Sequence, residues 1–229
     1  PNITKEDLQA KYEELGLNDP LIVRYGRWLG NFVTGDLGYS MDSTRAPVNE
    51  LVKERIKPTL ILTGGAMLLS LIIAIPIGII SATRQYSVFD YLATLGAFLG
   101  VSIPSFFFGL VLLFTFSLNL NLFPSGGFSN PVGENTIWVH LHHAILPIIA
   151  LGLARVASMT RYMRSSMLEV IREDYIRTAR AKGLKDRIVI YKHALRNALI
   201  PVVTLLGLSV PLLFGGSVII EEVFSYPGM

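Results

Sequence analysis

The sequence predicts an all-α polytopic membrane protein. Hydrophobic residues make up 51% of the chain and charged residues only 16%, with a mean hydropathy of +0.49. These values lie outside the range of an ordinary soluble domain. Three runs also contain no Asp, Glu, Lys or Arg, and each exceeds the roughly 20 residues that cross a bilayer. These runs are 58–83, 91–118 and 197–220.

Residues 1–57 differ from the rest, because they carry eight basic and nine acidic residues. We expect an extracytoplasmic amphipathic segment here. The turn signal Asn18-Asp19-Pro20 precedes L-I-V-R-Y-G-R-W-L-G-N-F-V, whose apolar residues repeat at helical spacing. This pattern predicts a helix at the outer membrane interface, with Tyr25 and Trp28 as anchors and a solvated polar face.

Residues 58–229 are expected to contain four spans, at about 58–83, 89–118, 140–161 and 197–220. The third is the weakest, because Arg155 interrupts an otherwise apolar run. Arg155 either snorkels to the cytoplasmic headgroups, or lines a pathway or pairs with another helix. Pro104, within S-I-P, and the G-x-x-x-G match at 96–100 fit close helix packing. Alternatively, a kink at Pro104 lets helices move during transport.

The distribution of basic residues predicts the orientation. Residues 161–196 hold half of the chain's twenty Lys and Arg residues but only four acids, whereas 119–139 contains no Lys or Arg. The positive-inside rule therefore places 84–90 and 162–196 in the cytoplasm, and 1–57, 119–139 and 221–229 outside. Because topology accounts for the basic stretch, nucleic-acid binding is not expected.

The cytoplasmic stretch 162–196 divides at Gly183 into helix, glycine turn and helix. Apolar residues repeat at three- and four-residue spacing on both sides of the turn, and Asp186 is a candidate N-cap for the second helix. The repeating positions are Leu168, Ile171, Tyr175 and Thr178 or Ala179 before the turn, and Ile188, Tyr191 and Leu195 after it. Such a loop either contacts a cytoplasmic protein or lies on anionic headgroups.

Other chemistry has little support in the sequence. Cysteine is absent, and H-x-H-H at 140–143 is read as a polar helix start rather than a metal site, since no further ligand is fixed. No G-x-x-x-x-G-K-[ST] loop is present, so ATP chemistry must reside elsewhere. A membrane-embedded enzyme or a proton-coupled carrier would need facing ionisable groups within the spans, and Arg155 is the only one predicted there.

The stretches D-Y-I-R-T-A-R-A-K-G-L and H-A-L-R-N-A-L-I-P resemble the cytoplasmic EAA loop of type I ABC importer permeases, in the dipeptide and oligopeptide group. W-L-G-N-F-V-T-G-D-L-G-Y-S, P-V-N-E-L-V-K-E-R-I-K-P-T-L, S-I-P-S-F-F-F-G-L and E-E-V-F-S-Y-P-G-M match the first of the two permease subunits of that group. The resemblance covers almost the whole chain. Arg177 and Thr178 replace the Glu and Ala of the general pattern, and 193–196 replaces its Ile-x-Leu-Pro ending.

The resemblance implies that residues 58–229 form an ABC transmembrane type-1 domain in the inner (plasma) membrane of a prokaryote. A six-helix subunit is implied, with one span before Pro1 and one after Met229. The implied partners are a second, homologous permease subunit, two ATPase subunits and an extracytoplasmic solute-binding protein. ATP and Mg would be bound by the ATPases, with no cofactor in this chain. The implied cargo is di- or oligopeptides, although related permeases carry nickel complexes, glutathione or oligosaccharides.

The resemblance also assigns residues to coupling, because the family's loop docks in a groove on the ATPase with the glycine turn as the contact. Gly183 would supply a left-handed or close-approach position, and Ala179 and Ala181 would keep the surface low. Arg155 and Pro104 remain candidates for the pathway or for helix pairing. The coupling residues are Asp174, Tyr175, Arg177, Thr178, Ala179, Arg180, Ala181, Lys182, Gly183, Leu184, His193, Leu195, Arg196 and Asn197.

Overall fold

The computed structural model describes residue 9 and residues 16–41, 45–129 and 136–229. Within these ranges every regular element is a helix, which confirms the all-α prediction. The chain divides into two compact units, Pro1–Glu54 and Arg55–Met229, and each is described by itself.

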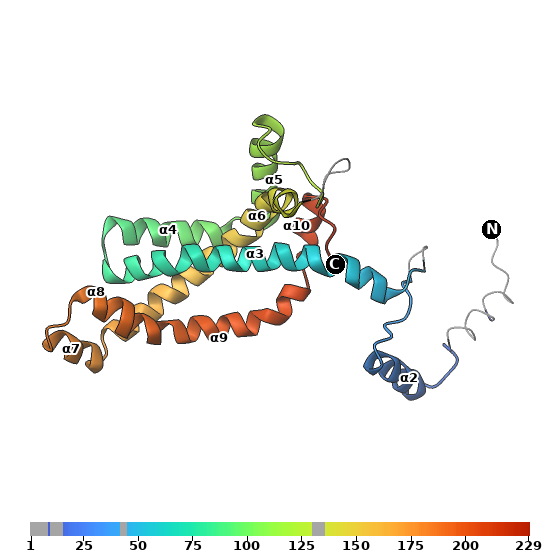
Figure 1. The fold of residues 1–229 in the computed structure, drawn as a ribbon, viewed down its shortest axis with the longest axis horizontal. Helices are drawn as coiled ribbons and strands as arrows, with labels where there is room; N and C mark the ends of the chain where they lie inside the picture. Colours follow the sequence, from blue (N-terminus) through green and yellow to red (C-terminus); the bar gives the residue numbers. More distant parts are fainter. Residues whose placement is uncertain (1–8, 10–15, 42–44, 130–135) are drawn as a thin grey trace. The chain divides into compact units, whose positions relative to one another are not determined.

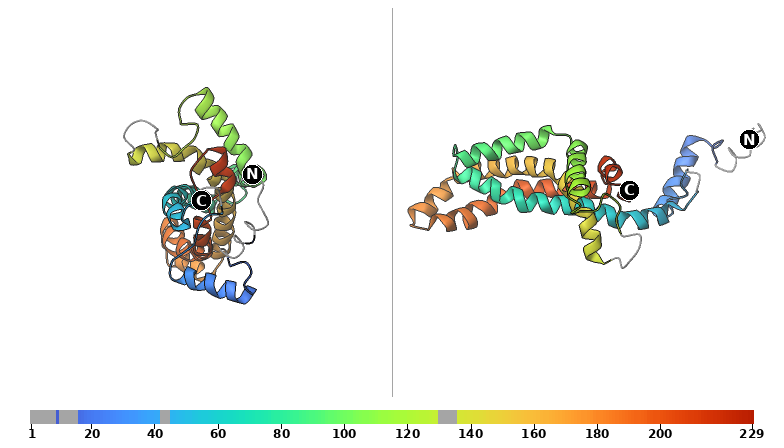
Figure 2. Two further views of the ribbon diagram at one scale, coloured as in Figure 1. Left: turned by 90° about the vertical axis from the view of Figure 1, so that its right-hand side faces the viewer. Right: turned by 90° about the horizontal axis from the view of Figure 1, so that it is seen from above.

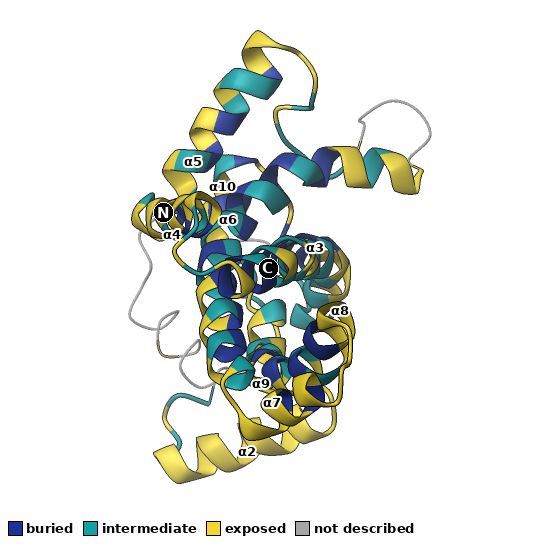
Figure 3. Cartoon of the chain, turned by 90° about the vertical axis from the view of Figure 1, so that its left-hand side faces the viewer, coloured by how far each residue is buried: buried dark blue, intermediate teal, exposed yellow. Residues whose placement is uncertain are grey.

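The first unit contains α2 (Leu21–Val33), which begins after Pro20 as the turn signal predicts. None of its residues is buried, and Figure 3 shows it exposed along its whole length. Its aromatic side chains contact one another, with ring centroids 5.8 Å apart for Tyr25 and Trp28 and 5.4 Å apart for Trp28 and Phe32. An exposed row of aromatic side chains is what we expect for a helix that contacts an apolar environment, such as the predicted membrane interface.

The second unit is built around long helices, with α7 and α8 at one end and α10 at the other (Figure 1). Three continuous helices are long and apolar enough to cross a membrane, at Val48–Thr83, Ile137–Ile171 and Asp186–Phe214. A bent pair, Val88–Ser102 with Ser105–Asn119, would be a fourth. The elements are α3 (Val48–Thr83), α4 (Val88–Ser102), α5 (Ser105–Leu112), the π-helix η1 (Leu113–Asn119), α6 (Ile137–Ile171), α7 (Asp174–Ala181), α8 (Asp186–Ile188), the π-helix η2 (Val189–Ala194), α9 (Leu195–Phe214) and α10 (Val218–Val223).

Helix α6 is the central element, since it packs against α4, α5 and α9 (Figure 2). It also approaches α3 closely at glycines. A Cβ atom added to Gly78 would lie 2.7 Å from Cβ of Met163, and one added to Gly152 would lie 3.1 Å from Leu69. Small residues thus allow the backbones to meet, as is usual between membrane helices.

Two clusters of buried apolar side chains form the core. The first, here called the loop-end cluster, joins α3, α6, α7, η2 and α9, with Met163, Met167, Ile176 and Val189 fully buried. The second lies toward the α10 end of the unit and includes Leu62, Leu146, Ile220 and Phe224. Each cluster therefore fixes one end of the helix bundle.

The run predicted as one span at 89–118 is broken, which corrects the expected kink. Helices α4 and α5 meet at an angle of 99°. Ile103, at the end of α4, has an extended backbone (φ −83°, ψ 122°), as expected for a residue before proline. Pro104 is the exposed N-cap of α5. It ends one helix and starts another, so it does not kink a continuous helix.

The predicted span 197–220 is also interrupted. Helix α9 ends at Phe214, and α10 starts a separate helix at Val218. Gly216 adopts a left-handed conformation (φ +64°), and a Cβ there would lie 2.6 Å from Oε1 of Glu221. The conformation and the close contact both require glycine, so the helix cannot continue through this position.

Candidate functional site

The predicted coupling loop connects α6 to α9. Helix α6 ends at Ile171, α7 follows from Asp174 to Ala181, and a turn leads into α8, which begins at Asp186. From Asp186 onward α8, η2 and α9 form one continuous helix of 29 residues ending at Phe214. The helix, glycine turn and helix predicted from the sequence are therefore present.

The turn after α7 is a Schellman motif. The backbone N–H of Gly183 donates to the carbonyl of Arg180 (2.9 Å), and that of Leu184 donates to the carbonyl of Ala179 (3.4 Å). Gly183 has φ +73°, the left-handed conformation that is one of the two alternatives expected for it. The alternative reason for a glycine, close approach, does not apply within the chain, because an added Cβ would meet nothing within 4 Å.

Apolar anchors hold this loop against the long helices. Ile176 is fully buried and Ala179 is 8% exposed, and both belong to the loop-end cluster with Val189, Ile190 and Ala194. Ala179 therefore packs inward, which corrects the expectation that it keeps the contact surface low. Ala181 is exposed, as that expectation requires.

Polar contacts join the two halves of the loop. Nδ2 of Asn197 donates to the Tyr175 hydroxyl at 2.7 Å, and Nε of Arg180 donates to Oδ1 of Asp186 at 3.3 Å. Within α7, Arg177 pairs with Asp174 at 3.1 Å, and the Thr178 hydroxyl donates to the Asp174 carbonyl at 2.9 Å. The first two contacts link α7 to the helix that follows the turn.

Most of the predicted coupling residues are exposed, and three are not. Ala179 is buried, while His193 and Leu195 are half-buried, so these three belong mainly to the packing beneath the loop. The exposed members are Asp174, Tyr175, Arg177, Thr178, Arg180, Ala181, Lys182, Gly183, Leu184, Arg196 and Asn197.

Two local predictions for the second helix are wrong. Asp186 is its first helical residue and Lys185 is the N-cap, with no side-chain cap, because the Asp186 carboxylate accepts from Arg180 instead. Ile188 and Tyr191 are exposed, whereas the buried residues are Val189, Ile190, Ala194 and Ala198. Three of these four buried residues lie in the π-helix η2, whose wider turn departs from the α-helical spacing on which the prediction rests.

Arg155 lines a cavity of about 450 Å³ between α3, α5, α6 and α9. The cavity also contains the hydroxyl groups of Ser70, Ser105, Ser158 and Ser209. Arg155 is half-buried, and the residues that line the cavity with it come from four helices. Pro104 is not among the residues that line this cavity, although its neighbour Ser105 is.

A second charged group lies at the α3–α4 turn. The guanidinium of Arg164 donates from Nε to Oδ1 of Asp90 (2.6 Å) and from Nη2 to Oδ2 (2.8 Å). The Ser81 hydroxyl and the backbone N–H of Tyr86 also donate to this carboxylate. One buried acid thus joins α3, α4 and α6.

Comparison with known proteins places the chain in a family. Residues 74–229 match the profile described as binding-protein-dependent transport system inner membrane component. The chain belongs to this family. It is therefore a multi-pass protein of the bacterial inner membrane and one component of a transport system that uses a binding protein.

Relatives with assigned names cover this inner membrane component along nearly its whole length. It is 48% identical to an oligopeptide transport system permease protein of Bacillus subtilis, over all of this chain and 72% of the relative. It is 43% identical to a dipeptide transport system permease protein of Alkalihalophilus pseudofirmus, over 95% of the chain and 70% of the relative. A glutathione transport system permease protein of Pectobacterium atrosepticum is 42% identical, over 95% of the chain and 67% of the relative.

The Asp90–Arg164 pair was missed by the sequence reasoning, which treated Arg155 as the single ionisable residue within the spans. One local signal was available for Asp90. Asp90 follows Ser87 by three residues, the spacing between a helix N-cap and the acidic residue of a capping box. In the structure the backbone N–H of Asp90 donates to the Ser87 hydroxyl at 3.2 Å. Arg164 falls within the predicted loop 162–196, but α6 continues past it to Ile171.

The three histidines near the start of α6 bind backbone and form no metal cluster with other described residues. Ring nitrogens of His140, His142 and His143 lie 2.8, 3.1 and 3.0 Å from the carbonyl oxygens of Phe128, Leu122 and Gly126. They attach the preceding loop to the helix start, in line with the polar role predicted for them.

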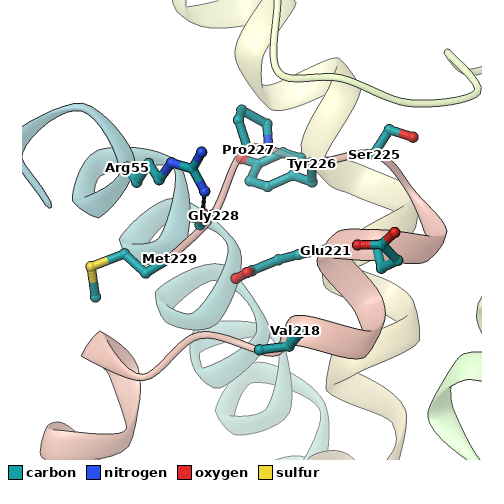
Figure 4. A pocket seen from close by; sticks show the side chains of 9 residues that line it. Arg55, Val218, Glu221, Ser225, Tyr226, Pro227, Gly228 and Met229 are labelled. Atoms are coloured by element: carbon teal, nitrogen blue, oxygen red, sulfur yellow. Dashed lines mark hydrogen bonds between the residues drawn. The ribbon is translucent and has the colours of Figure 1, made fainter. Parts of the chain in front are cut away.

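The E-E-V-F-S-Y-P-G-M segment surrounds Glu221 at the α10 end of the unit (Figure 4). Glu221 is 6% exposed and lines a cavity of about 610 Å³ together with Arg55 and Tyr226. Its carboxylate accepts from the backbone N–H of Ser217 at 3.2 Å. Burial raises the pKa of Glu221 above its ordinary value, while the Ser217 N–H and the charge of Arg55 oppose the rise. Glu221 thus joins the start of α10 to the segment that follows it.

Proposed function

We propose that this chain is the membrane-spanning permease subunit of an ATP-binding-cassette importer and forms part of the pathway for di- or oligopeptides. The observation that carries the proposal is the exposed Schellman turn at Gly183, held by buried anchors between two helices long enough to cross the membrane. The peptide cargo is supported by the named functions of two relatives at 48% and 43% identity.

The exposed residues of α7 and its turn are the ATPase contact. The turn exposes Lys182, Gly183 and Leu184, and its central residue, Gly183, has no side chain. Such a turn can fit into a groove on the ATPase. Beneath it, Ile176 is fixed in the same cluster as Met163 of α6 and Val189 of η2. A force on the turn is therefore transmitted to α6 and α9 through packed side chains, and rigid-body movement of these helices would alternate access to the two sides.

The remaining partners follow from this role. A second, homologous permease subunit completes the pathway, and two ATPase subunits supply ATP and Mg chemistry, for which this chain has no phosphate-binding loop. An extracytoplasmic solute-binding protein delivers the cargo. The chain itself is a transport subunit and not a catalyst.

Glutathione is the second candidate cargo, favoured by the 42% identity to a glutathione permease protein. Both candidates are peptides with free carboxylates, so the permease chemistry they need is similar. Selection between them belongs largely to the binding protein.

Reconstitution of the whole transporter tests the proposal. Proteoliposomes that contain both permeases, the ATPases and the binding protein should take up a labelled peptide only when ATP is supplied on the ATPase side. Omission of the ATPase subunits should abolish uptake. Uptake that persists without them would indicate a secondary carrier and refute the proposal.

A further inference from the structure

We propose that Arg155 and the hydroxyl groups around it form a carboxylate-binding subsite within the membrane, which receives the C-terminal carboxylate of the transported peptide. The inference rests on the proposed function, since it concerns the cargo of that same permease.

The position of Arg155 makes an isolated charge costly. It lies on α6 within the predicted span 140–161, six residues before Arg161, which is about 9 Å along the helix at 1.5 Å per residue. An unpaired guanidinium at such a depth is expensive, and ionisable residues there usually face a cavity or a partner. Within the described part of the chain Arg155 has no hydrogen-bond or salt-bridge partner.

Arg164 provides the comparison on the same helix. Its guanidinium is held by two hydrogen bonds to Asp90, so it is neutralised within the chain. The Arg155 guanidinium is therefore available to an anion that does not belong to the described part of this chain.

The lining of the cavity matches an organic anion. Ser70 and Ser209 donate to carbonyls of their own helices, so their hydroxyl protons are already used and these two residues supply no donor to an anion. The hydroxyls of Ser105, Ser158 and Tyr162 have no partner among the described residues, so they are free to donate to a carboxylate beside the guanidinium. Methionine and leucine side chains complete the lining and suit the apolar part of a ligand.

The geometry favours a peptide carboxylate over other anions. Arginine binds carboxylates in a bidentate manner, and a volume of about 450 Å³ is within the usual range for small-molecule sites. A C-terminal carboxylate is shared by all linear peptides, so a site that reads it is compatible with varied side chains. A lipid phosphate would require Arg155 to reach the headgroups, whereas it lies among four helices.

Cysteine chemistry tests the site directly, because the chain contains no cysteine. Ser158→Cys places a thiol one helical turn from Arg155 on the same cavity. In the complete reconstituted transporter, its modification by anionic and cationic methanethiosulfonate reagents is measured on this subunit by mass spectrometry. We expect Arg155→Gln to lower the ratio of anionic to cationic rates about tenfold, the change that about 1.4 kcal/mol of lost attraction produces.

Peptide protection gives the second measurement. Trialanine with a free carboxylate should slow modification of Ser158→Cys, trialanine amide at the same concentration should not, and Arg155→Gln should remove the difference. Transport at saturating loaded binding protein should fall at least tenfold in Arg155→Gln and less than twofold in Arg161→Gln, whose side chain is exposed.

Several outcomes would overturn the proposal. The first is a Ser158→Cys thiol that does not react with either reagent, and the second is equal protection of this thiol by trialanine and by trialanine amide. The third is full transport by Arg155→Lys, which would indicate a snorkelling side chain. Reduced assembly of Arg155→Gln would indicate pairing with an acid of another subunit or span. ATP-dependent uptake by the unchanged transporter is measured in the same vesicles. Its absence refutes the proposed function, whereas its presence with any of these outcomes refutes the carboxylate subsite alone.

Discussion

Removal of the Asp90 carboxylate should destabilise the helix bundle by about 3 kcal/mol. Its side chain is 4% exposed and that of Arg164 is 27% exposed, and four donors converge on the carboxylate. Loss of one partner from a buried ion pair costs about 3–5 kcal/mol, because the other charge is left uncompensated. Since Arg164 retains some contact with solvent, we expect the Asp90→Ala variant at the lower end of that range.

The cost should depend on Arg164. In the double variant Asp90→Ala with Arg164→Met, no unpaired charge remains, so most of the lost stability should return. Asp19→Ala is the matched control, because Asp19 pairs with Arg27 at 2.8 Å but the two side chains are 39% and 57% exposed. Exposed pairs contribute at most about 1 kcal/mol.

Equilibrium unfolding in mixed micelles, with an increasing fraction of denaturing detergent and detection by circular dichroism, measures these differences. A loss below about 1 kcal/mol for Asp90→Ala would contradict the reasoning. So would a double variant no more stable than the single one, since the unpaired guanidinium would then not be the source of the cost.

Three further predictions concern the loop, the orientation and pH. Gly183→Asp should reach the membrane at normal abundance yet lose ATP-dependent uptake, because a side chain and a negative charge are added at a left-handed position in the contact turn; normal uptake would remove the coupling assignment. A cysteine at exposed Ser125 should react with an impermeant thiol reagent added outside the inner membrane, and one at Lys185 only after that membrane is opened; the opposite pattern would reverse the topology. Burial raises the pKa of Glu221, so its carboxyl group holds a proton more tightly in the folded state than in the unfolded chain. The contribution of Glu221 to stability should therefore decline as the pH rises from below the ordinary pKa of a glutamate through the raised pKa of the folded state. Glu221→Gln should flatten that decline in unfolding measured between pH 4 and 8, and an unchanged slope would exclude Glu221 as its source.

Local signals in the sequence were sufficient for the helices and the turn. Charge-free runs located α3 and α9, and the spacing of apolar residues located α2. The glycine turn was predicted between two helical patterns, and the positive φ of Gly183 is one of the two alternatives that the resemblance implied for it. These features depend on residues close together in the chain.

Features that depend on distant residues were not predictable in this way. Asp90 and Arg164 are 74 residues apart, and no pattern near either one indicates its partner. The break at Pro104 lies in a run that is apolar on both sides, so composition does not distinguish a kink from a separation into two helices. The buried residues of η2 lie in a π-helix, and a prediction based on α-helical spacing does not indicate where such a turn occurs. For the site, sequence similarity indicated the loop, but only packing reveals that Ala179 lies beneath its surface.

The helices α8, η2 and α9 run without a break from the glycine turn into the predicted membrane span. The helix from Asp186 to Phe214 has 29 residues, so at 1.5 Å per residue it is about 43 Å long. If it pivots near its first turn, a tilt of about 10° displaces its far end by about 7 Å, more than one helical turn. A small rotation at the glycine turn would thereby become a larger displacement at the far end of α9, where the break at 215–217 separates α9 from α10.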